Sequence, residues 1–211
     1  QWDWEKIITN EDRNEEYLKD TVRAIYSAVL NTAIVLQEKY PCLDNYLPPE
    51  IAFVTSFELE ERYPDLTPKQ REYEAAKEYG AVFIMKIGGK LKSGQKHDGR
   101  APDYDDWDLN GDIMLYNRVL DIAFEISSMG IRVDRESLLK QLKAEGKEDR
   151  VKFEFHKMLL SGALPLTIGG GIGQSRLCMF LLHKAHVGEV QVSIWPKKEI
   201  LKCKQKGINL L

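Results

Sequence analysis

The sequence predicts a single α+β domain, built on a mainly antiparallel β-sheet that is flanked by helices. The chain has 211 residues, which is enough for one sizeable domain with a real core. Stretches with strand character often follow one another directly, whereas a doubly wound parallel sheet needs strands that alternate with helices. No internal repeat, low-complexity tract or long linker interrupts the sequence. We therefore expect one domain over residues 1–211.

The composition excludes several classes of protein. Hydrophobic residues make up 43% and charged residues 30% of the chain, as in an ordinary globular protein. The net charge is −3 and the lysines and arginines are spread out, which argues against a nucleic-acid-binding surface. No run of about 18 apolar residues predicts a membrane span. Cys42, Cys178 and Cys203 have no metal-binding spacing, so we expect free thiols and a cytoplasmic protein.

The first half of the chain predicts strands at both sides of a long helix. The stretch QWDWEKI at the beginning alternates polar and apolar residues, which is typical of a strand. Residues 14–39 predict an amphipathic helix of about 35–40 Å. Its apolar positions at helical spacing are Leu18, Val22, Ile25, Val29, Ala33 and Leu36. The stretch IAFVTSF, residues 51–57, predicts a short strand.

The next helix has clear start and stop signals. Thr67 fits the N-cap, Pro68 the first helical position, and Gln70 completes a capping box. Gly80 is expected to end the helix. A buried strand over residues 81–87 follows, and then GGKLKSGQKHDGR, which we expect to be a mobile loop.

The second half predicts two consecutive strands and three helices. An acidic segment, APDYDDWDLNGD, precedes the strands IMLYN and AFEIS, which begin at residues 113 and 123. Asp134 is expected to cap a helix that ends near Glu145, with Gly146 as its stop. Another helix is predicted over residues 149–160. A buried helix over SRLCMFLLHKAH and a last strand or extended segment at EVQVSIW complete the prediction.

The stretch TIGGGIGQSR, residues 167–176, fits neither common glycine loop. It lacks the lysine of a P-loop, and a Rossmann fingerprint would need glycine at position 174, which is glutamine. A strand, a glycine turn and a helix remain, with Arg176 in the first turn. A cation there is unfavourable by about 0.3–1 kcal/mol, so Arg176 needs a partner. That partner is either an internal carboxylate or a flat or phosphorylated ligand, which the glycines would let approach.

The acidic segment allows two interpretations. Five aspartates lie within ten positions: Asp103, Asp105, Asp106, Asp108 and Asp112. They form either a solvated loop or, together with the interleaved Tyr104 and Trp107 and the preceding Arg100, a pocket for an ammonium group or a metal-bound phosphate.

Two carboxylates on neighbouring strands predict a magnesium site. Asp112 is expected to begin one strand, and Glu125 lies within the next, so antiparallel pairing can bring both to one face. Mg²⁺ typically takes one or two carboxylates plus substrate phosphates. Arg132 either binds a substrate carboxylate or pairs with Asp134 or Glu136. The four histidines, His97, His156, His183 and His186, form no recognisable metal-binding pattern.

Taken together, several stretches resemble known proteins. GGGIGQSR, QWDWE and FEISSMGIR resemble parts of the class II aminoacyl-tRNA synthetase catalytic fold, with Glu125 and Arg132 at the seven-residue spacing of aspartyl enzymes. A more specific resemblance runs in order along nearly the whole chain. QWDWE, RYPDL, RAPDYDDW, LNGDI, SSMGIRVD and TIGGGIGQSRL are similar to the ammonia-dependent asparagine synthetases, the aspartate–ammonia ligase family.

This resemblance implies a reaction and its substrates. ATP and L-aspartate would form a β-aspartyl-adenylate and pyrophosphate, and ammonia would then release asparagine and AMP. ATP and Mg²⁺ are thereby implied, with Mg²⁺ held by Asp112 and Glu125. Arg176 would bind adenine or the terminal phosphates.

The resemblance also implies roles for the remaining site residues. Gly169, Gly170 and Gly171 would give the nucleotide room. The residues implied around aspartate are Gln1, Asp3, Arg100, Asp105, Ser128 and Arg132. Arg100, Asp105 and Arg176 would act in catalysis, with Asp105 taking a proton as ammonia attacks.

The chain departs from the family in two places. Members of the family carry about a hundred further residues before QWDWE, including the segment through which we expect a homodimer to form. They also have a longer segment where Asp108 alone separates Trp107 from Leu109. We expect these portions to be deleted or missing from this sequence.

Two other functions stay open at this point. One is an aspartyl-tRNA synthetase-like enzyme, although nothing resembles an anticodon-binding domain and no basic stripe is present, so tRNA is not expected as a partner. The other is a non-catalytic protein that senses a nucleotide or an amino acid. The presence of Asp112, Glu125, Arg132 and Arg176 argues against lost chemistry.

Overall fold

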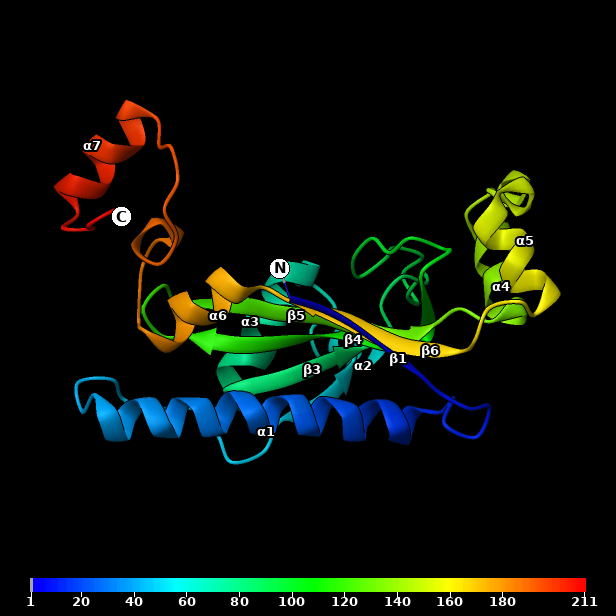
Figure 1. The fold of residues 1–211 in the computed structure, drawn as a ribbon, viewed down its shortest axis with the longest axis horizontal. Coiled ribbons are helices and arrows are strands. Elements are labelled where there is room, and N and C mark those ends of the chain that lie inside the picture. The colour runs from blue at the N-terminus through cyan, green and yellow to red at the C-terminus, as the bar shows by residue number, and fades with distance from the viewer. Residues whose placement is uncertain (1) are drawn as a thin grey trace.

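The computed structural model describes residues 2–211 and contains a six-stranded sheet (Figure 1). The strands are β1 (Trp2–Ile7), β2 (Ala52–Thr55), β3 (Ala81–Met85), β4 (Asp105–Asn117), β5 (Ile122–Arg132) and β6 (Thr167–Ile172). Their order across the sheet is β1–β6–β5–β4–β3–β2. All neighbouring strands are antiparallel except β2 and β3. The predicted α+β class with a mainly antiparallel sheet is confirmed.

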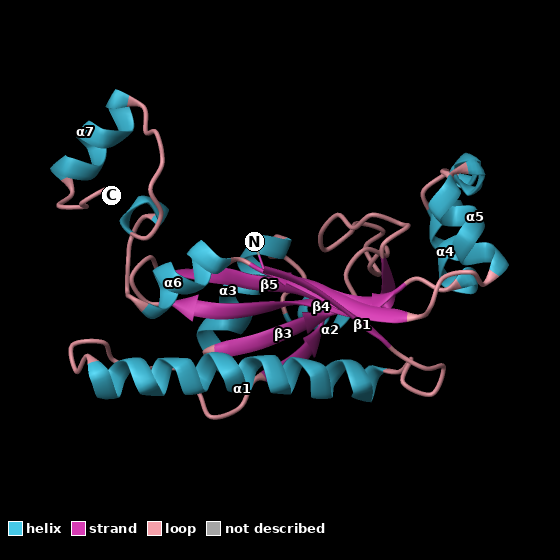
Figure 2. Ribbon diagram, in the orientation of Figure 1, coloured by secondary structure: helices cyan, strands magenta, loops and turns pink. Residues whose placement is uncertain are grey.

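Seven α-helices accompany the sheet in the described part of the chain (Figure 2). They are α1 (Glu15–Lys39), α2 (Ser56–Arg62), α3 (Pro68–Tyr79), α4 (Arg135–Ala144), α5 (Glu154–Ser161), α6 (Gln174–Leu181) and α7 (Lys197–Gln205). Parallel strands need a long crossover, and α2 with α3 supplies it between β2 and β3. The sequence did not predict α2, because seven residues are too few for a clear helical period.

The long helix α1 covers one face of the sheet, as Figure 1 shows. Asn14 caps the helix by accepting a hydrogen bond from the Tyr17 N–H. The buried side chains of α1 are Leu18, Val22, Tyr26, Val29 and Ala33. The first four of them share one core with residues of β3, β4, β5 and β6, including Phe83, Ile113, Met129 and Ile168. The predicted amphipathic helix is therefore confirmed.

Half of the opposite face is covered by α3. The helix begins with the predicted capping box of Thr67 and Gln70, with Pro68 in its first turn. Gly80 follows at φ +74°, a conformation that favours glycine, and ends the helix as expected. Ala75 and Ala76 pack against Val82, Ile84 and Met114 of β3 and β4. The rest of this face, over the middle of β4, β5, β6 and β1, carries small and charged residues instead.

The two central strands are longer than the sequence predicted. β4 begins at Asp105, so the acidic segment lies largely in the strand, and Asp112 lies in its middle rather than at its start. The start of β4 is held by Gln141 of α4. Its side chain accepts a hydrogen bond from the Trp107 N–H and donates one to the Asp105 carbonyl. Because Gln141 lies far away in the sequence, the local pattern could not indicate this support.

The C-terminal part differs from the prediction in three respects. The glycines of TIGGGI lie within β6, not in a turn after it. Helix α6 is not buried on all sides, because Cys178 is exposed while Met179 and Phe180 are buried. Of the two alternatives for EVQVSIW, the strand is wrong, because the segment forms no strand and its Ile194 side chain is 98% exposed. Helix α7, which was not predicted, follows.

The remaining predictions for this half hold in part. Asp134 caps α4 through a hydrogen bond from the Ser137 N–H, and Gly146 follows the helix at φ +63°. The helix predicted over residues 149–160 is divided, because Phe153 is extended between a 3₁₀ turn at Glu148–Lys152 and α5. No helix among residues 2–211 is both long and apolar enough to cross a membrane.

Candidate active site

The uncovered face of the sheet has a floor of small residues. The pairing register places Asp112, Ser128, Gly171 and Asp3 side by side in one row across four strands. The neighbouring row consists of Asn110, Gly130, Gly169 and Glu5. Successive residues of a strand point to opposite faces, so both rows share the face opposite α1. The small residues in the middle of each row leave space above the sheet. These two rows together are called the floor.

Gly169 cannot be replaced without displacing charged side chains. A Cβ atom at Gly169 would lie 2.1 Å from Glu5 Oε2 and 2.5 Å from Arg132 Nη2. Gly171 lies two positions further on the same face, so the prediction that both give room on this side agrees with their placement. Gly170 points to the other face, where a Cβ would lie 2.5 Å from the Cβ of the core residue Met129. The prediction for Gly170 is therefore corrected, because core packing explains this glycine.

Arg132, at the end of β5, joins two carboxylates. Its guanidinium forms an ion pair with Asp105 of β4 and another with Glu5 of β1, at 2.9 Å. The Tyr104 ring lies 4.0 Å from the guanidinium carbon and stacks on it. Burial raises the pKa of Asp105, although the nearby Arg132 opposes this shift. The alternative that Arg132 pairs with Asp134 or Glu136 is wrong.

A second buried ion pair joins Arg100 to Asp112, which belongs to the first of the two rows. One terminal nitrogen of Arg100 donates to both carboxylate oxygens of Asp112, whose side chain is only 3% exposed. Burial raises the pKa of Asp112, Glu125 raises it further, and Arg100 and the Ser128 hydroxyl oppose the shift. Asp112 and Glu125 therefore lie close enough to repel each other, as their predicted placement on one face required.

Arg176 in the first turn of α6 has the partner that its position demands. Its Nη1 lies 3.4 Å from Glu125 Oε1 and donates a hydrogen bond to the Glu125 carbonyl at 3.2 Å. The Arg176 side chain is 55% exposed and that of Glu125 is 37% exposed. An exposed ion pair of this length contributes about 0–1 kcal/mol, so both groups stay available to a ligand.

The carboxylates fit a divalent cation. Mg²⁺ prefers oxygen ligands, and Asp112 and Glu125 supply carboxylates from adjacent strands on one face. Their mutual repulsion, which helps to raise the pKa of Asp112, is the repulsion that a cation between them would relieve.

The other predicted residues distribute as follows. Asp3 is exposed and shares the row of Asp112, Ser128 and Gly171. Gln1 lies outside the described residues. Of the five clustered aspartates, only Asp105 and Asp112 belong to the site.

The other three aspartates have partners outside the site. Asp103 pairs with Arg150 and His156, Asp106 with Arg13, and Asp108 with Lys140. Neither a solvated loop nor one pocket of five acids describes the segment.

Glu5 contacts Arg132 and was not identified by the sequence analysis, whereas Tyr104 was named there as a possible pocket residue. For Glu5 a signal was present. It lies two positions after Asp3 in a strand, and alternation therefore puts both on one face. The stacking of Tyr104 on Arg132 joins the residue before β4 to the end of β5, and no local pattern indicates that contact.

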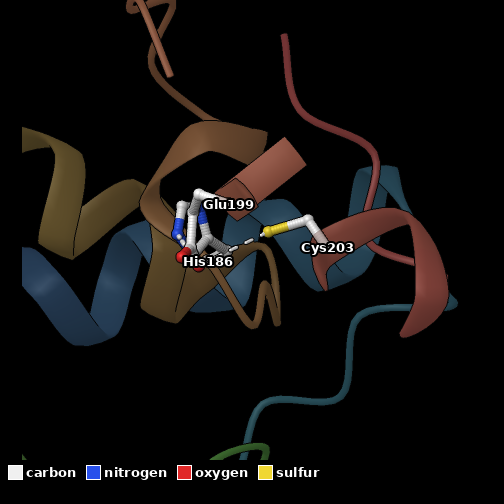
Figure 3. A group of neighbouring side chains, drawn as sticks. All are labelled: His186, Glu199 and Cys203. Carbon is white, nitrogen blue, oxygen red and sulfur yellow. Dashed lines mark hydrogen bonds and ion pairs between the residues drawn. The ribbon is translucent and has the colours of Figure 1, made fainter. Parts of the chain in front are cut away.

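A second cluster, His186, Glu199 and Cys203, lies beside α7 at the C-terminal end of the fold (Figure 3). Its potential ligand atoms lie within 4.8 Å of one another. However, His186 Nδ1 accepts a hydrogen bond from the Gly188 N–H at 3.0 Å, so the proton belongs on Nε2, which faces Glu199 at 3.8 Å. A metal-binding imidazole nitrogen carries no proton. The cluster is therefore better explained as a set of structural contacts between α7 and the turn before it. The spacing of these residues in the sequence did not predict the cluster.

Comparisons with solved structures agree with this architecture. Aspartyl-tRNA synthetase from Entamoeba histolytica superposes with a TM-score of 0.60 and 17% identity, covering 90% of this chain and 41% of that one. Asparaginyl-tRNA synthetase from Pyrococcus horikoshii, complexed with asparaginyl-adenylate, gives a TM-score of 0.57 and 16% identity, covering 88% and 44%. At these identities the likeness shows the fold, which is the class II aminoacyl-tRNA synthetase catalytic fold.

Sequence relatives are much closer. The chain is 62% identical over 211 residues to an aspartate–ammonia ligase from Fusobacterium nucleatum and 62% identical to one from Clostridium tetani. It is matched over its whole length, and it spans 64% and 62% of those two proteins. The family model described as aspartate-ammonia ligase matches residues 1–207. The chain therefore belongs to the aspartate–ammonia ligase family.

Proposed function

We propose that the protein makes L-asparagine from L-aspartate, ammonia and ATP through a β-aspartyl-adenylate, releasing AMP and pyrophosphate. Membership in the aspartate–ammonia ligase family supports this reaction. The structural observation that carries it is the pair of buried arginine–carboxylate contacts, Arg100–Asp112 and Arg132–Asp105, on an open floor of small residues. One catalytic domain over residues 1–211 contains these groups.

The charges of the floor match those of aspartate. Arg100 and Arg132 offer guanidinium groups to its two carboxylates, for which a planar fork of donors is well suited. The acidic side chains of Asp3 and Glu5, on β1 across β6 from Arg132, suit its ammonium group. The Ser128 hydroxyl, in the row of Asp112, completes the aspartate site. Bound in this way, the β-carboxylate is oriented for reaction without any movement of the sheet.

The reaction then needs charge stabilisation and one proton acceptor. A β-carboxylate oxygen attacks the α-phosphorus of ATP and pyrophosphate leaves, while Arg176 stabilises charge on the phosphates or stacks on adenine. Ammonia then attacks the activated carbonyl carbon and AMP leaves. Asp105 takes the proton that the attacking nitrogen loses, and burial suits this role because it raises the pKa of Asp105. When bound by Asp112 and Glu125, Mg²⁺ would neutralise phosphate charge.

The proposal includes the cellular location and the oligomeric state of the protein. Free cysteines, two of them exposed, support a reducing cytoplasmic location.

We expect the working form to be a homodimer whose contact lies outside residues 2–211. Light scattering of the complete protein tests this point, and a monomeric mass at working concentration would contradict it.

The activity is tested by incubating the complete protein with ATP, Mg²⁺, aspartate and ammonium and measuring AMP and asparagine. We expect both products in equal amounts, and neither when aspartate or ammonium is left out. Formation of AMP only in the presence of tRNA would instead indicate an aspartyl-tRNA synthetase-like enzyme. Tight binding of ATP and aspartate without any turnover would indicate a sensor.

Replacing Arg176 with alanine should weaken ATP binding about 10- to 100-fold and leave the fold intact, because its half-exposed pair with Glu125 contributes little stability. Titration calorimetry measures the ATP affinity, and thermal unfolding measures stability. If the variant unfolds and the wild-type protein has negligible ATP affinity, Arg176 serves only as a structural ion pair.

A further inference from the structure

Lys69, in the first turn of α3, has a cationic side chain that the site described above does not use. Its side chain is 68% exposed and is held by carboxylates on two sides. Nζ lies 3.0 Å from Glu72 Oε2 in the same helix and 3.7 Å from Asp98 Oδ2 in the loop that leads to Arg100. Glu72 is itself buried, and His97 Nε2 lies 3.3 Å from its Oε1, so protein encloses the carboxylate that anchors the lysine.

The position of α3 places Lys69 on the side of the sheet that carries the floor, beside the loop that leads to Arg100. The helix packs across β4 and β5, on the face that carries Asp112, Ser128 and Glu125. Burial acts to lower the pKa of Lys69, but Glu72, Asp98 and Glu125 raise it above its ordinary value. Glu125 pairs with the exposed Arg176 of α6, and Lys69 of α3 lies beside the loop that leads to Arg100, the partner of Asp112.

We propose that Lys69 binds the β- and γ-phosphates of ATP and the pyrophosphate that leaves, on the same side of the floor as Glu125. This assignment rests on the proposed function. In the adenylation step, the bond between the α-phosphorus and the bridging oxygen breaks, and pyrophosphate leaves with its electron pair. The aspartate β-carboxylate forms the new bond to phosphorus. Lys69 transfers no proton and acts as a fixed positive charge on a flexible stem, a common way to bind phosphate.

The assignment explains why a lysine stands there. The carboxylates of Glu72, Asp98, Glu125 and Asp112 alone would repel a polyphosphate. The Lys69 and Arg176 side chains are 68% and 55% exposed, so both cationic groups can turn from these carboxylates to a phosphate.

The test compares Lys69→Met, Lys69→Arg and Lys77→Met in the complete protein. Lys77 is an exposed lysine of the same helix, with its Nζ 3.0 Å from the Tyr73 hydroxyl, away from the floor. Lys69→Met should weaken the binding of Mg²⁺–pyrophosphate and raise the KM for ATP roughly 10- to 100-fold. The KM for aspartate should stay within about threefold. Lys69→Arg should recover much of the loss, and Lys77→Met should behave as wild type.

Calorimetry with Mg²⁺–pyrophosphate separates this assignment from the proposed reaction. If the wild-type protein makes no asparagine but loses pyrophosphate affinity with Lys69→Met, the proposed reaction fails and the role of Lys69 stands. If asparagine is made and Lys69→Met binds pyrophosphate normally, the role of Lys69 is overturned. An Asp98→Asn variant that loses as much pyrophosphate affinity as Lys69→Met would also overturn it, because the lysine would then act only by holding the loop.

Discussion

Replacing Arg132 with alanine is expected to lower kcat/KM for aspartate by about three orders of magnitude. The substitution removes the guanidinium proposed to bind a substrate carboxylate. It also leaves Asp105 buried without its cation, which should lower the free energy of unfolding by about 3–5 kcal/mol. Steady-state kinetics and urea unfolding measure the two effects.

Because that loss of stability could unfold the protein, two further variants isolate the substrate role. Arg132→Lys keeps the charge but loses the fork of donors, so it should fold and still lose about 100-fold in kcat/KM for aspartate. Arg13 is a matched control, since its side chain is also 10% exposed and also joins two carboxylates, Asp106 and Asp134. Arg13→Ala should lose stability but keep kcat/KM in the folded protein. Equal kinetic losses at Arg13 and Arg132 would contradict the assignment.

Asp112→Asn is expected to lower kcat by about 100- to 1,000-fold and to raise the Mg²⁺ concentration needed for half-maximal activity. The amide removes a charged ligand from the proposed cation site and a partner from Arg100. The KM for aspartate should change much less than the Mg²⁺ requirement. Rates measured over a series of Mg²⁺ concentrations, and Mn²⁺ binding followed by electron paramagnetic resonance, test both points.

Asp106 provides the control on the same strand. It is buried and paired with an arginine as Asp112 is, but its partner is Arg13 and it lies outside the floor. Asp106→Asn should lower stability with an unchanged Mg²⁺ requirement. If Asp112→Asn leaves Mn²⁺ binding and the Mg²⁺ requirement at wild-type values, Asp112 holds no cation, and its only role is to neutralise Arg100.

How far the sequence predicts this site depends on the range of each interaction. Two consecutive strands indicated that Asp112 and Glu125 could share one face, but Glu125 lies on the face of Ser128 and Arg132 only because a β-bulge separates the Ile113–Ser127 and Met114–Glu125 pairs. The cap signals of Thr67 and Asp134 located two helices. Arg176 was expected to need a partner on electrostatic grounds alone, and Glu125 is that partner. These are local properties of short segments.

The features that could not be predicted from the sequence depend on contacts between segments that lie far apart in the chain. Arg132 and Glu5 are 127 positions apart, and their ion pair forms only because β6 inserts between β1 and β5. The same insertion turns Gly169 towards the site and Gly170 towards the core. The early start of β4 depends on hydrogen bonds from Gln141 of α4, and the exposure of α6 depends on which elements pack against it. The periodicity of a segment does not indicate which distant elements contact it.

The central claim is that aspartate is activated by transfer of the adenylyl group of ATP to its β-carboxylate, with loss of pyrophosphate. The activity assay with aspartate that carries ¹⁸O in both β-carboxylate oxygens tests it most directly. Mass spectrometry should find one ¹⁸O atom in each AMP, one in each asparagine, and none in pyrophosphate. Unlabelled AMP, or label in inorganic phosphate accompanied by ADP, would contradict the adenylate.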